Sequence, residues 1–392
     1  MTDETDIENR VAESGRGGAD DLPEDEVEQA KLEHRERQRQ QRRELEHVFR
    51  SIGTWEWLDT EPPPARSLVE LPTGAPWLPR GKVGMLAAPG GTGKSQALIQ
   101  LALCVACGPA SERNWLDYFP IPDDARGPVV LALGEEGERD CHRRIRHVVD
   151  TLNYTAAERD AIRRNLYTLP LAGRPSALLD DPGRLERKLE REFGDPSPGE
   201  LDRAMLGYTE QVQNWHDLLH GPPDENSSPP WKAIILDPAS RFAGPDTEQD
   251  NAVATRFVEI LEGWALEAFG DQAVGPSLLV SHHVKKSAAT NPKELLYNQG
   301  AARGSSGLTD GVRWQANMAV SEFKTRGEVS DVVGLNVVKA NAGPAGEATF
   351  LKRREYGVLE HDPGGAGKFY DDADGSTDKR FADDQSEYAE DL

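Results

Sequence analysis

The chain has 392 residues, 37% of them hydrophobic and 29% charged, a composition that fits globular proteins better than membrane proteins. It contains no apolar run of about 18 residues, so the sequence predicts no membrane-spanning helix. The acidic N-terminus lacks the apolar centre of a secretory signal, and we therefore expect a cytoplasmic protein. The net charge of −23 does not exclude a local basic surface for nucleic acid, because much of it lies at the two ends of the chain.

Residues 1–65 are predicted to form an acidic extension outside the folded core. The first 28 residues hold 11 acids and 2 bases with few apolar residues, which predicts disorder. Residues 26–50 are strong helix formers with few apolar positions. This pattern favours a solvated charged helix, although its arginines offer DNA or partner contact as an alternative. At the other end, residues 361–392 hold 10 acids and 3 bases and are also expected to be disordered.

Residues 66–360 have the pattern of an α/β domain. Four short apolar runs are predicted strands: Val83–Ala87, Val129–Leu133, Ala233–Leu236 and Leu278–Ser281. Amphipathic helical patterns alternate with these runs, which predicts a mostly parallel sheet with helices on both faces. Three later runs are separated by Gly-containing turns and predict antiparallel strands that extend the sheet: Ala316–Phe323, Val332–Val338 and Ala348–Lys352.

An insertion at about residues 172–230 interrupts the alternation. Charged helical patterns around Arg184–Phe193 and Leu201–His220 lie between Pro-rich flanks, and we expect a helical hairpin on the surface. The spacing of Cys104 and Cys107 suggests zinc or redox chemistry, but both residues stand in an apolar helical pattern without a second such pair. Buried helix packing is therefore the favoured interpretation of these cysteines.

The clearest motif follows the first core strand. Residues 88–95 read Ala-Pro-Gly-Gly-Thr-Gly-Lys-Ser and precede an apolar helix, which is the context of a phosphate-binding loop. The loop departs from the strict pattern only at Ala88, where its turn begins. The glycines allow successive backbone N–H groups to point at phosphates. The predicted nucleotide-binding residues are Pro89, Gly90, Gly91, Thr92, Gly93, Lys94, Ser95 and Gln96.

Acidic residues at the ends of two other strands complete an ATP–Mg²⁺ site. Asp237 ends a buried strand that we expect beside the first, where a carboxylate could hold Mg²⁺ together with the Ser95 hydroxyl. Glu135 and Glu136 follow Val129–Leu133, and one of them could orient the attacking water. We favour Glu135, with Glu136 as the alternative, because acids there could also simply begin the next helix.

Further polar residues follow the later strands. His282 and His283 end one strand, where a side chain could contact the γ-phosphate; a metal site is the alternative, but no third ligand of suitable spacing is visible. Arg303 and Arg313 come after a long polar loop, and either could act as an arginine finger on a neighbouring subunit's ATP. A surface salt bridge is the plainer interpretation of these arginines.

Taken together, these motifs resemble those of the RepA-type hexameric replicative helicases within the RecA/DnaB superfamily. The resemblance covers about residues 66–360 and includes Leu236-Asp237 with Arg241-Phe242, Arg303-Gly304-Ser305-Ser306, Arg313-Trp314-Gln315 and Lys339-Ala340-Asn341. It implies a RecA-like P-loop fold with ATP and Mg²⁺ as cofactors.

The resemblance also implies a role for each matched residue. Lys94 and Ser95 would bind phosphate and Mg²⁺, Asp237 would hold Mg²⁺ through water, and Glu135 would polarise the attacking water. His283 would sense the γ-phosphate, and Arg313 would be the finger that acts in trans, with Arg303 less favoured. The DNA-contacting loops would be Ala239–Asn251 and Val284–Ala302, the second carrying Lys285, Lys286 and Lys293.

The leading hypothesis is a ring-shaped, ATP-driven DNA helicase of plasmid, phage or mobile-element replication. It would bind single-stranded DNA as a homo-hexamer, and its tails or insertion could recruit a replication protein. The alternatives are a RecA/KaiC-like DNA-binding ATPase without unwinding activity, and an ATP-dependent switch or scaffold.

Overall fold

The computed structural model describes residues 59–61, 65–193, 207–221, 230–267, 274–304, 306–325, 328–341 and 343–370. The chain divides into two compact units, Met1–Pro64 and Ala65–Leu392. Nearly all of the predicted N-terminal extension lies outside the described residues, as does the acidic tail from residue 371 onward. Within the described ranges, no helix is long and apolar enough to cross a membrane.

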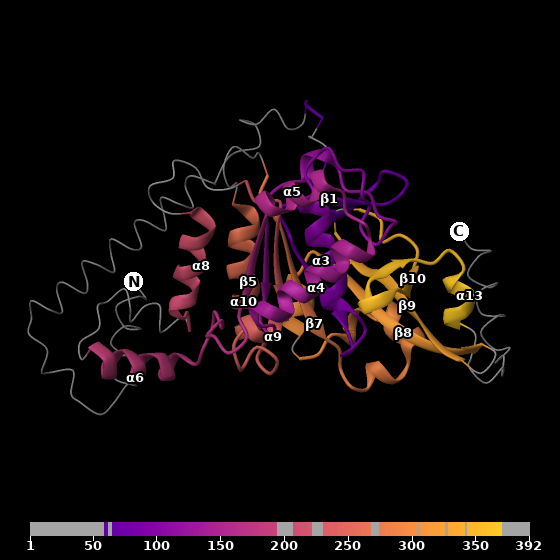
Figure 1. The fold of residues 1–392 in the computed structure, drawn as a ribbon. Coiled ribbons are helices and arrows are strands. Elements are labelled where there is room, and N and C mark those ends of the chain that lie inside the picture. The colour runs from indigo at the N-terminus through magenta and orange to yellow at the C-terminus, as the bar shows by residue number, and fades with distance from the viewer. Residues whose placement is uncertain are drawn as a thin grey trace, which may run out of the picture. The chain divides into compact units, whose positions relative to one another are not determined.

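A nine-stranded sheet forms the centre of the second unit, in the order β11-β10-β9-β8-β3-β7-β6-β4-β5. The strands are β3 (Val83–Ala88), β4 (Val129–Leu133), β5 (Leu166–Pro170), β6 (Ala233–Asp237), β7 (Ser277–His283), β8 (Trp314–Thr325), β9 (Glu328–Ala340), β10 (Thr349–Arg353) and β11 (Leu359–His361). Neighbours from β8 to β5 pair in parallel, whereas β8 to β11 pair antiparallel. Figure 1 shows the antiparallel strands at one side of the sheet and β5 at the other. The predicted α/β class, with a parallel core and antiparallel C-terminal strands, is confirmed.

A separate two-stranded sheet precedes the core. It pairs β1 (Ser67–Glu70) with β2 (Pro76–Pro79) in antiparallel fashion. The sequence pattern did not predict this pair, because neither strand is a continuous apolar run: Glu70 ends the first, and Pro76 and Pro79 bound the second.

Helices cover both faces of the central sheet. One face carries α3 (Lys94–Ala106), α4 (Glu138–Thr151) and α5 (Ala156–Asn165), and the other carries α8 (Glu210–His220), α9 (Ala239–Phe242), α10 (Asn251–Leu266), α11 (Pro292–Tyr297), α12 (Ser306–Gly311) and α13 (Gly365–Tyr370). Alternate residues of one strand enter different cores: Leu86 packs with α3, whereas Met85 packs with α10. This alternation explains why the core strands read as continuous apolar runs.

Short 3-10 helices occur in the connections. They are η3 (Asp123–Ala125), η4 (Ala288–Thr290), η5 (Gln299–Ala301) and η6 (Glu355–Gly357).

The insertion contains helices where the sequence predicts them. The first is α6 (Pro182–Phe193), and α8 is the second; residues 194–206 and 222–229 lie outside the described residues. The second helix is more than a surface element, because Trp215 is buried and stacks on Trp264 of α10 with ring centroids 5.6 Å apart. This contact fastens α8 to the core.

The folded part of the chain ends about ten residues later than predicted. The expected tail begins at residue 361, but α13 continues the ordered chain to Tyr370. Phe369 is fully buried and its ring centroid lies 5.3 Å from that of Phe350, while Lys368 pairs with Asp362 at 2.7 Å. A six-residue helix with a single large apolar anchor leaves little periodic signal in the sequence, because its stability comes from tertiary contacts.

The cysteine pair is part of the core, as the sequence analysis favours. Cys104 of α3 and Cys107, the C-cap residue of that helix, are buried free thiols. Burial raises the pKa of Cys104 to about 11 and that of Cys107 to about 12. Both thiols therefore stay protonated at neutral pH and act as small apolar side chains.

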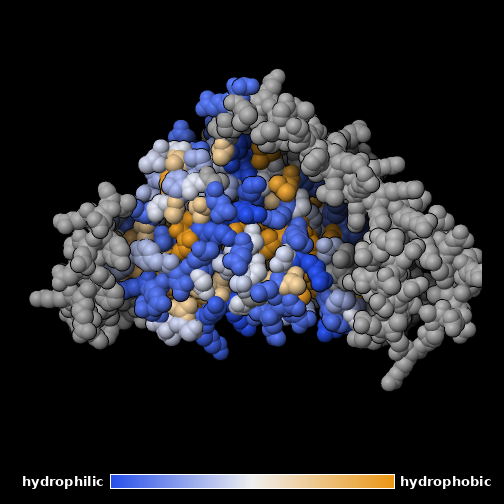
Figure 2. Space-filling view, turned by 180° about the vertical axis from the view of Figure 1, so that it is seen from behind, coloured by the Kyte–Doolittle hydropathy of each residue, from blue (hydrophilic) through white to orange (hydrophobic). Residues whose placement is uncertain are grey.

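The surface is mainly polar on the face in Figure 2, where hydrophobic residues gather in small groups among hydrophilic ones. Six large hydrophobic side chains are exposed among the described residues: Tyr167, Leu218, Leu266, Tyr297, Tyr356 and Tyr370. Single exposed residues of this kind are ordinary on a folded protein.

Candidate functional site

The predicted phosphate-binding loop joins β3 to α3 at the carboxyl edge of the parallel sheet. Gly91 and Gly93 have φ values of 74° and 109°, in the left-handed region that favours glycine. Gly93 is the N-cap of α3, which begins at Lys94. The strand, the loop and the helix thus follow each other as the motif requires, and the positive end of α3 faces the loop.

Lys94 is almost completely buried at the start of α3. Its Nζ donates to the carbonyl oxygens of Ala88 at 2.9 Å and Pro89 at 3.0 Å. Burial lowers the pKa of Lys94, while the negative charges of Asp237 and Glu135 oppose this shift. The Lys94 ammonium group therefore lies close enough to two carboxylates to feel their negative charges, one at the end of β6 and one in the turn after β4.

Asp237 lies in the interior with 2% of its surface exposed. The sequence predicts that the strand of Asp237 is a neighbour of β3, but β7 lies between β3 and β6. The intervening strand has a consequence: Ser281 of β7 donates its hydroxyl to Oδ1 of Asp237. Ser281 therefore fixes the carboxylate, and it is a site residue that the sequence analysis missed.

Glu135 and Glu136 follow β4 but have different surroundings. Glu135 is half-exposed, and Arg241 of α9 donates to its Oε1 at 3.3 Å. Glu136 is mostly buried and pairs with Arg144 of α4 at 2.8 Å. Burial raises the pKa of Glu136, and Arg144 opposes this shift. Glu135 acts electrostatically on both Lys94 and His283, so it is the carboxylate nearer to the predicted site.

The two histidines at the end of β7 point to opposite faces of the sheet, since side chains alternate along a strand. His283 lies beside Ala88 of β3, directly before the phosphate loop. Burial lowers the pKa of His283, and the Lys94 cation lowers it further. His282 is buried on the other face, where its Nε2 lies 2.7 Å from the carbonyl oxygen of Arg303. A carbonyl only accepts, so Nε2 carries the proton in the neutral ring.

The two candidate finger arginines lie at different edges of the sheet. Arg303 lies near the phosphate loop, because its backbone N–H donates to the His283 carbonyl and its guanidinium pairs with Glu248 at 2.9 Å. Arg313 precedes β8, and its N–H donates to the carbonyl of Val83 at the start of β3. The Arg313 guanidinium pairs with Glu262 of α10 at 3.6 Å. Arg313 is thus at the opposite end of β3 from the phosphate loop of its own chain.

The predicted DNA-binding lysines follow β7. Lys285 donates to the carbonyl of Gly300 at 3.1 Å, and Lys293 donates to that of Tyr370 at 2.9 Å. Lys286 is exposed, with no hydrogen bond or ion pair to the described residues. The structure therefore ties two of the three ammonium groups to the backbone of this chain.

Arg353 of β10 is a second residue that the sequence analysis missed. Its Nη2 donates to the carbonyl oxygens of Gly91 at 3.1 Å and Thr92 at 2.7 Å. The separation of about 260 residues along the chain gives no local signal for this contact, although a basic residue inside the last predicted strands is visible in the sequence.

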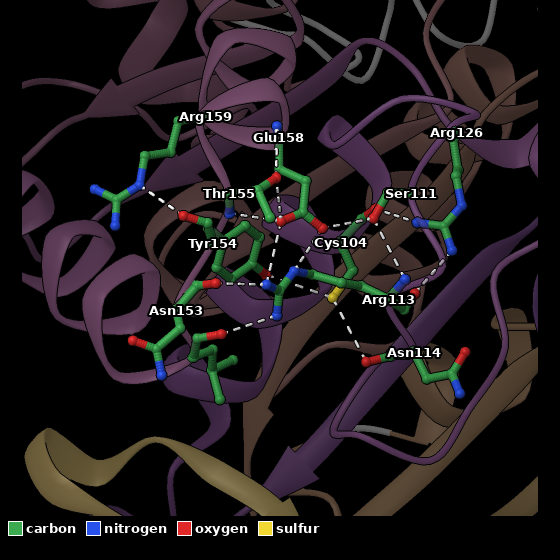
Figure 3. Close-up of polar contacts among 11 residues, drawn as sticks. Cys104, Ser111, Arg113, Asn114, Arg126, Asn153, Tyr154, Thr155, Glu158 and Arg159 are labelled. Carbon is green, nitrogen blue, oxygen red and sulfur yellow. Dashed lines mark hydrogen bonds and ion pairs between the residues drawn. The ribbon is translucent and has the colours of Figure 1, made fainter.

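A polar network holds the C-terminal half of α3 (Figure 3). Arg113 donates to Glu158 of α5 at 2.7 Å and to the carbonyls of Leu152 and Asn153 at 3.0 Å each. Burial would raise the pKa of Glu158, but hydrogen bonds from Arg113 and Thr155 lower it to about 2. Tyr154 from the same turn contacts Cys104 of α3 at 3.7 Å. The network supports the helix that carries Lys94 and has no contact with the phosphate loop itself.

The residues present fit a nucleotide with Mg²⁺. A Cβ added at Gly90 or Gly91 would meet nothing within 4 Å, so the outer surface of the loop is open. Gln96 Nε2, in the first turn of α3, is a buried donor without a hydrogen-bond partner among the described residues. Asp237 and Ser95 supply the hard oxygen ligands that Mg²⁺ prefers.

Comparison with known proteins identifies the family of the chain. The family model described as "AAA domain" matches residues 41–289, which is more than half of the chain. Among solved structures, an ATPase domain is similar at 10% identity and a TM-score of 0.41, over 72% of this chain and 85% of that one. The flagellar accessory protein FlaH from Methanocaldococcus jannaschii is similar at 11% identity and a TM-score of 0.36, over 72% and 90%.

Proposed function

This chain belongs to the AAA domain family and is a RecA-like P-loop ATPase, and we propose that it is a RepA-type DNA helicase. It would hydrolyse ATP in the cytoplasm as a ring of identical subunits on single-stranded DNA. The reaction would serve the replication of a plasmid, a phage or another mobile element. The single observation that carries the ATPase part of the proposal is a cluster at one edge of the sheet, in which Asp237 and Glu135 act electrostatically on Lys94 and Lys94 acts on His283.

The phosphate loop and Lys94 would bind the triphosphate. Lys94 would exchange its two carbonyl partners for β- and γ-phosphate oxygens, which are stronger acceptors because they are charged. Ser95 and Asp237 would hold Mg²⁺, which when bound neutralises charge on the β- and γ-phosphates. Ser281 keeps the Asp237 carboxylate in one orientation for this task.

Glu135 would orient and polarise the attacking water. Its carboxylate is half-exposed, and its contact with Arg241 at 3.3 Å is a weak one that a water can replace. Glu136 is less suited, because its short pair with Arg144 occupies it. His283 is held neutral by burial and by Lys94, so it can contact the γ-phosphate region through a ring N–H without adding a charge.

The position of Arg313 supports an assembly. Within one subunit, Arg313 lies at the wrong end of β3 to reach the nucleotide. A finger at that edge can act only on a neighbour that packs head to tail, and head-to-tail contacts close into rings when the rotation permits. The half-exposed pair with Glu262 is a weak contact that Arg313 could exchange for a phosphate.

Contact with DNA would come from the segment after β7. Lys286 is the favoured contact because its ammonium group is exposed and has no partner among the described residues. Lys285 and Lys293 would contribute by charge from their fixed positions, since each ammonium group has further donors.

The test is the ATPase rate with and without single-stranded DNA. We expect DNA to stimulate turnover of the wild type, and Lys286→Ala to reduce this stimulation without changing the basal rate. Lys188→Ala, a lysine of α6 in the insertion, is the matched control. Equal rates with and without DNA would contradict the DNA motor.

A second candidate is an ATP-dependent switch that uses the insertion to hold a partner. It is favoured by α8, which the Trp215–Trp264 stack fastens to α10, next to the sheet that carries the site. A RecA/KaiC-like protein that binds DNA without unwinding it is the third. Strand displacement on a forked duplex separates the helicase from both.

A further inference from the structure

Arg353 reaches the phosphate loop from the C-terminal antiparallel strands. One nitrogen of its guanidinium, Nη2, bonds two consecutive carbonyls of the loop, those of Gly91 at 3.1 Å and Thr92 at 2.7 Å. The other terminal nitrogen, Nη1, lies 3.4 Å from the position that a Cβ on Gly93 would occupy. Arg353 is therefore packed against the loop along three successive residues.

These two carbonyls belong to the peptide groups whose N–H donors are those of Thr92 and Gly93. In a trans peptide the C=O and the N–H point in opposite directions. Carbonyls that face Arg353 consequently turn the N–H groups of Thr92 and Gly93 to the other side of the loop. Backbone N–H groups of this loop are the donors that bind phosphates.

We propose that Arg353 is a positioning residue that orients and polarises the phosphate-binding amides of the loop. A cation that bonds a carbonyl withdraws electron density from its peptide group and strengthens the N–H as a donor. The two bonds also restrict the rotation of two peptide planes in a segment where Gly91 and Gly93 would otherwise leave the backbone free. The inference rests on the nucleotide-binding part of the proposed function and not on DNA or ring formation.

The position of Arg353 is fixed by a second contact between the same elements. Gln100 of α3 donates from Nε2 to the carbonyl of Leu359 at 2.8 Å and accepts from the Leu359 N–H at 2.8 Å. In the sheet, Leu359 of β11 is the direct partner of Arg353 of β10. The side chain of Leu359 also packs against Gly93, at 3.4 Å from an added Cβ. The C-terminal hairpin is thus held in register on the helix that follows the phosphate loop.

The neighbouring basic residues do not share this role. Arg354 pairs with Glu360 at 2.7 Å and Lys352 pairs with the same carboxylate at 3.7 Å. Both are exposed, and neither has a hydrogen bond to the loop within the part of the chain that the structure describes. Arg354 therefore provides a matched control with the same side chain one residue away.

The experiment measures the equilibrium affinity of the full chain for fluorescent ADP and ATP analogues. Arg353→Gln should weaken both nucleotides by the same factor, about tenfold to a hundredfold, because the amides that it polarises bind phosphates common to both. KM for ATP should rise by a similar factor while kcat changes little. Arg353→Lys should recover part of the affinity, because an ammonium keeps the positive charge but lacks the rigid planar guanidinium that holds both bonds in place. Arg354→Gln should bind like the wild type.

Two results would overturn the inference. One is wild-type ADP affinity in folded Arg353→Gln. The other is loss of ATP affinity with ADP affinity retained, which would mean direct contact with the γ-phosphate. If Arg353→Gln does not fold, the nucleotide affinity of Arg353→Lys tests the proposal instead. Wild-type affinity in Arg353→Lys would then contradict it. A wild type that binds neither nucleotide would refute the proposed function itself, whereas an absent response to DNA would leave this measurement valid.

Discussion

The two ends of β3 differ in how they hold charge. At the phosphate-loop end, Lys94 and Asp237 are buried, with 7% and 2% of their surfaces exposed. At the other end, Arg313 is half-exposed and its contact with Glu262 is long, at 3.6 Å. Burying charges is costly unless they are compensated, so the first arrangement persists because the groups support one another.

The difference indicates that each edge has its own task. In the proposed function the buried cluster binds phosphate within one chain, whereas the exposed arginine exchanges its partner for the phosphate of a neighbour. Lys339 supports the second edge, because its Nζ caps the carbonyls of Thr309 and Asp310 at 2.9 Å and 2.8 Å, at the end of α12. One subunit thus holds a candidate binding site at one edge and a candidate finger at the other.

The largest effect is expected from the buried edge. Lys94→Ala should reduce ATP turnover to the background rate, because it removes the cation that the loop places at the phosphates. Lys82→Ala, an exposed lysine directly before β3, changes the same residue type at the other end of the strand and should leave turnover unchanged. Wild-type turnover in Lys94→Ala would refute the site.

Arg313→Ala should leave ATP binding intact and lower turnover by about 10³–10⁵-fold, the range for arginine fingers. Arg303→Ala should have a much smaller effect, since Arg303 is paired with Glu248 beside His282. Steady-state ATPase rates and equilibrium nucleotide binding measure the two quantities separately. If Arg303→Ala loses far more turnover than Arg313→Ala, Arg303 is the arginine finger.

Glu135→Gln should bind ATP normally and hydrolyse it about 10²–10⁴-fold more slowly, because the amide keeps the shape but cannot act as a base. Glu136→Gln is the control, and single-turnover hydrolysis should place it near the wild type. If Glu136→Gln is the inactive variant, the assignment along this turn is wrong by one residue.

The smallest effect concerns stability and pH. Burial lowers the pKa of His282 below its usual value of 6.5, so between the two values the unfolded chain binds more protons than the folded chain. The free energy of unfolding should therefore fall as the pH drops below about 6.5, by at most about 1.4 kcal/mol per pH unit for one histidine. Urea unfolding at pH 7.5 and 5.5 should show a weaker dependence in His282→Gln. Equal pH dependence in both proteins would contradict this contribution of His282.

The sequence predicted the local parts of this architecture well. The four core strands and the phosphate loop lie where the apolar runs and the glycine spacing put them, because strand, loop and helix are contiguous in the chain. The confirmed α/β class, with its mostly parallel sheet, follows from the same alternation of strands and helices.

Features that depend on distant contacts were not predictable. In the sheet, β7 lies between β3 and β6, and this strand order allows the Ser281 hydroxyl to donate to the Asp237 carboxylate. Arg353 contacts a phosphate loop that lies about 260 residues earlier in the sequence. The position of Arg313 at the far end of β3 follows from the hydrogen bond of its backbone N–H to the Val83 carbonyl. The hydrophobic periodicity of the sequence does not indicate which strands are neighbours in the sheet or which distant residues are in contact.

The most direct test of the account mixes Arg313→Ala subunits with Lys94→Ala subunits under conditions where subunits exchange. Each variant alone should be inactive, but a Lys94→Ala subunit can offer its Arg313 to the intact phosphate loop of an Arg313→Ala neighbour. We expect partial ATPase activity to return in the mixture, in proportion to the fraction of such interfaces. Absence of activity in mixed assemblies, with exchange verified by native mass spectrometry, would contradict a finger that acts between subunits.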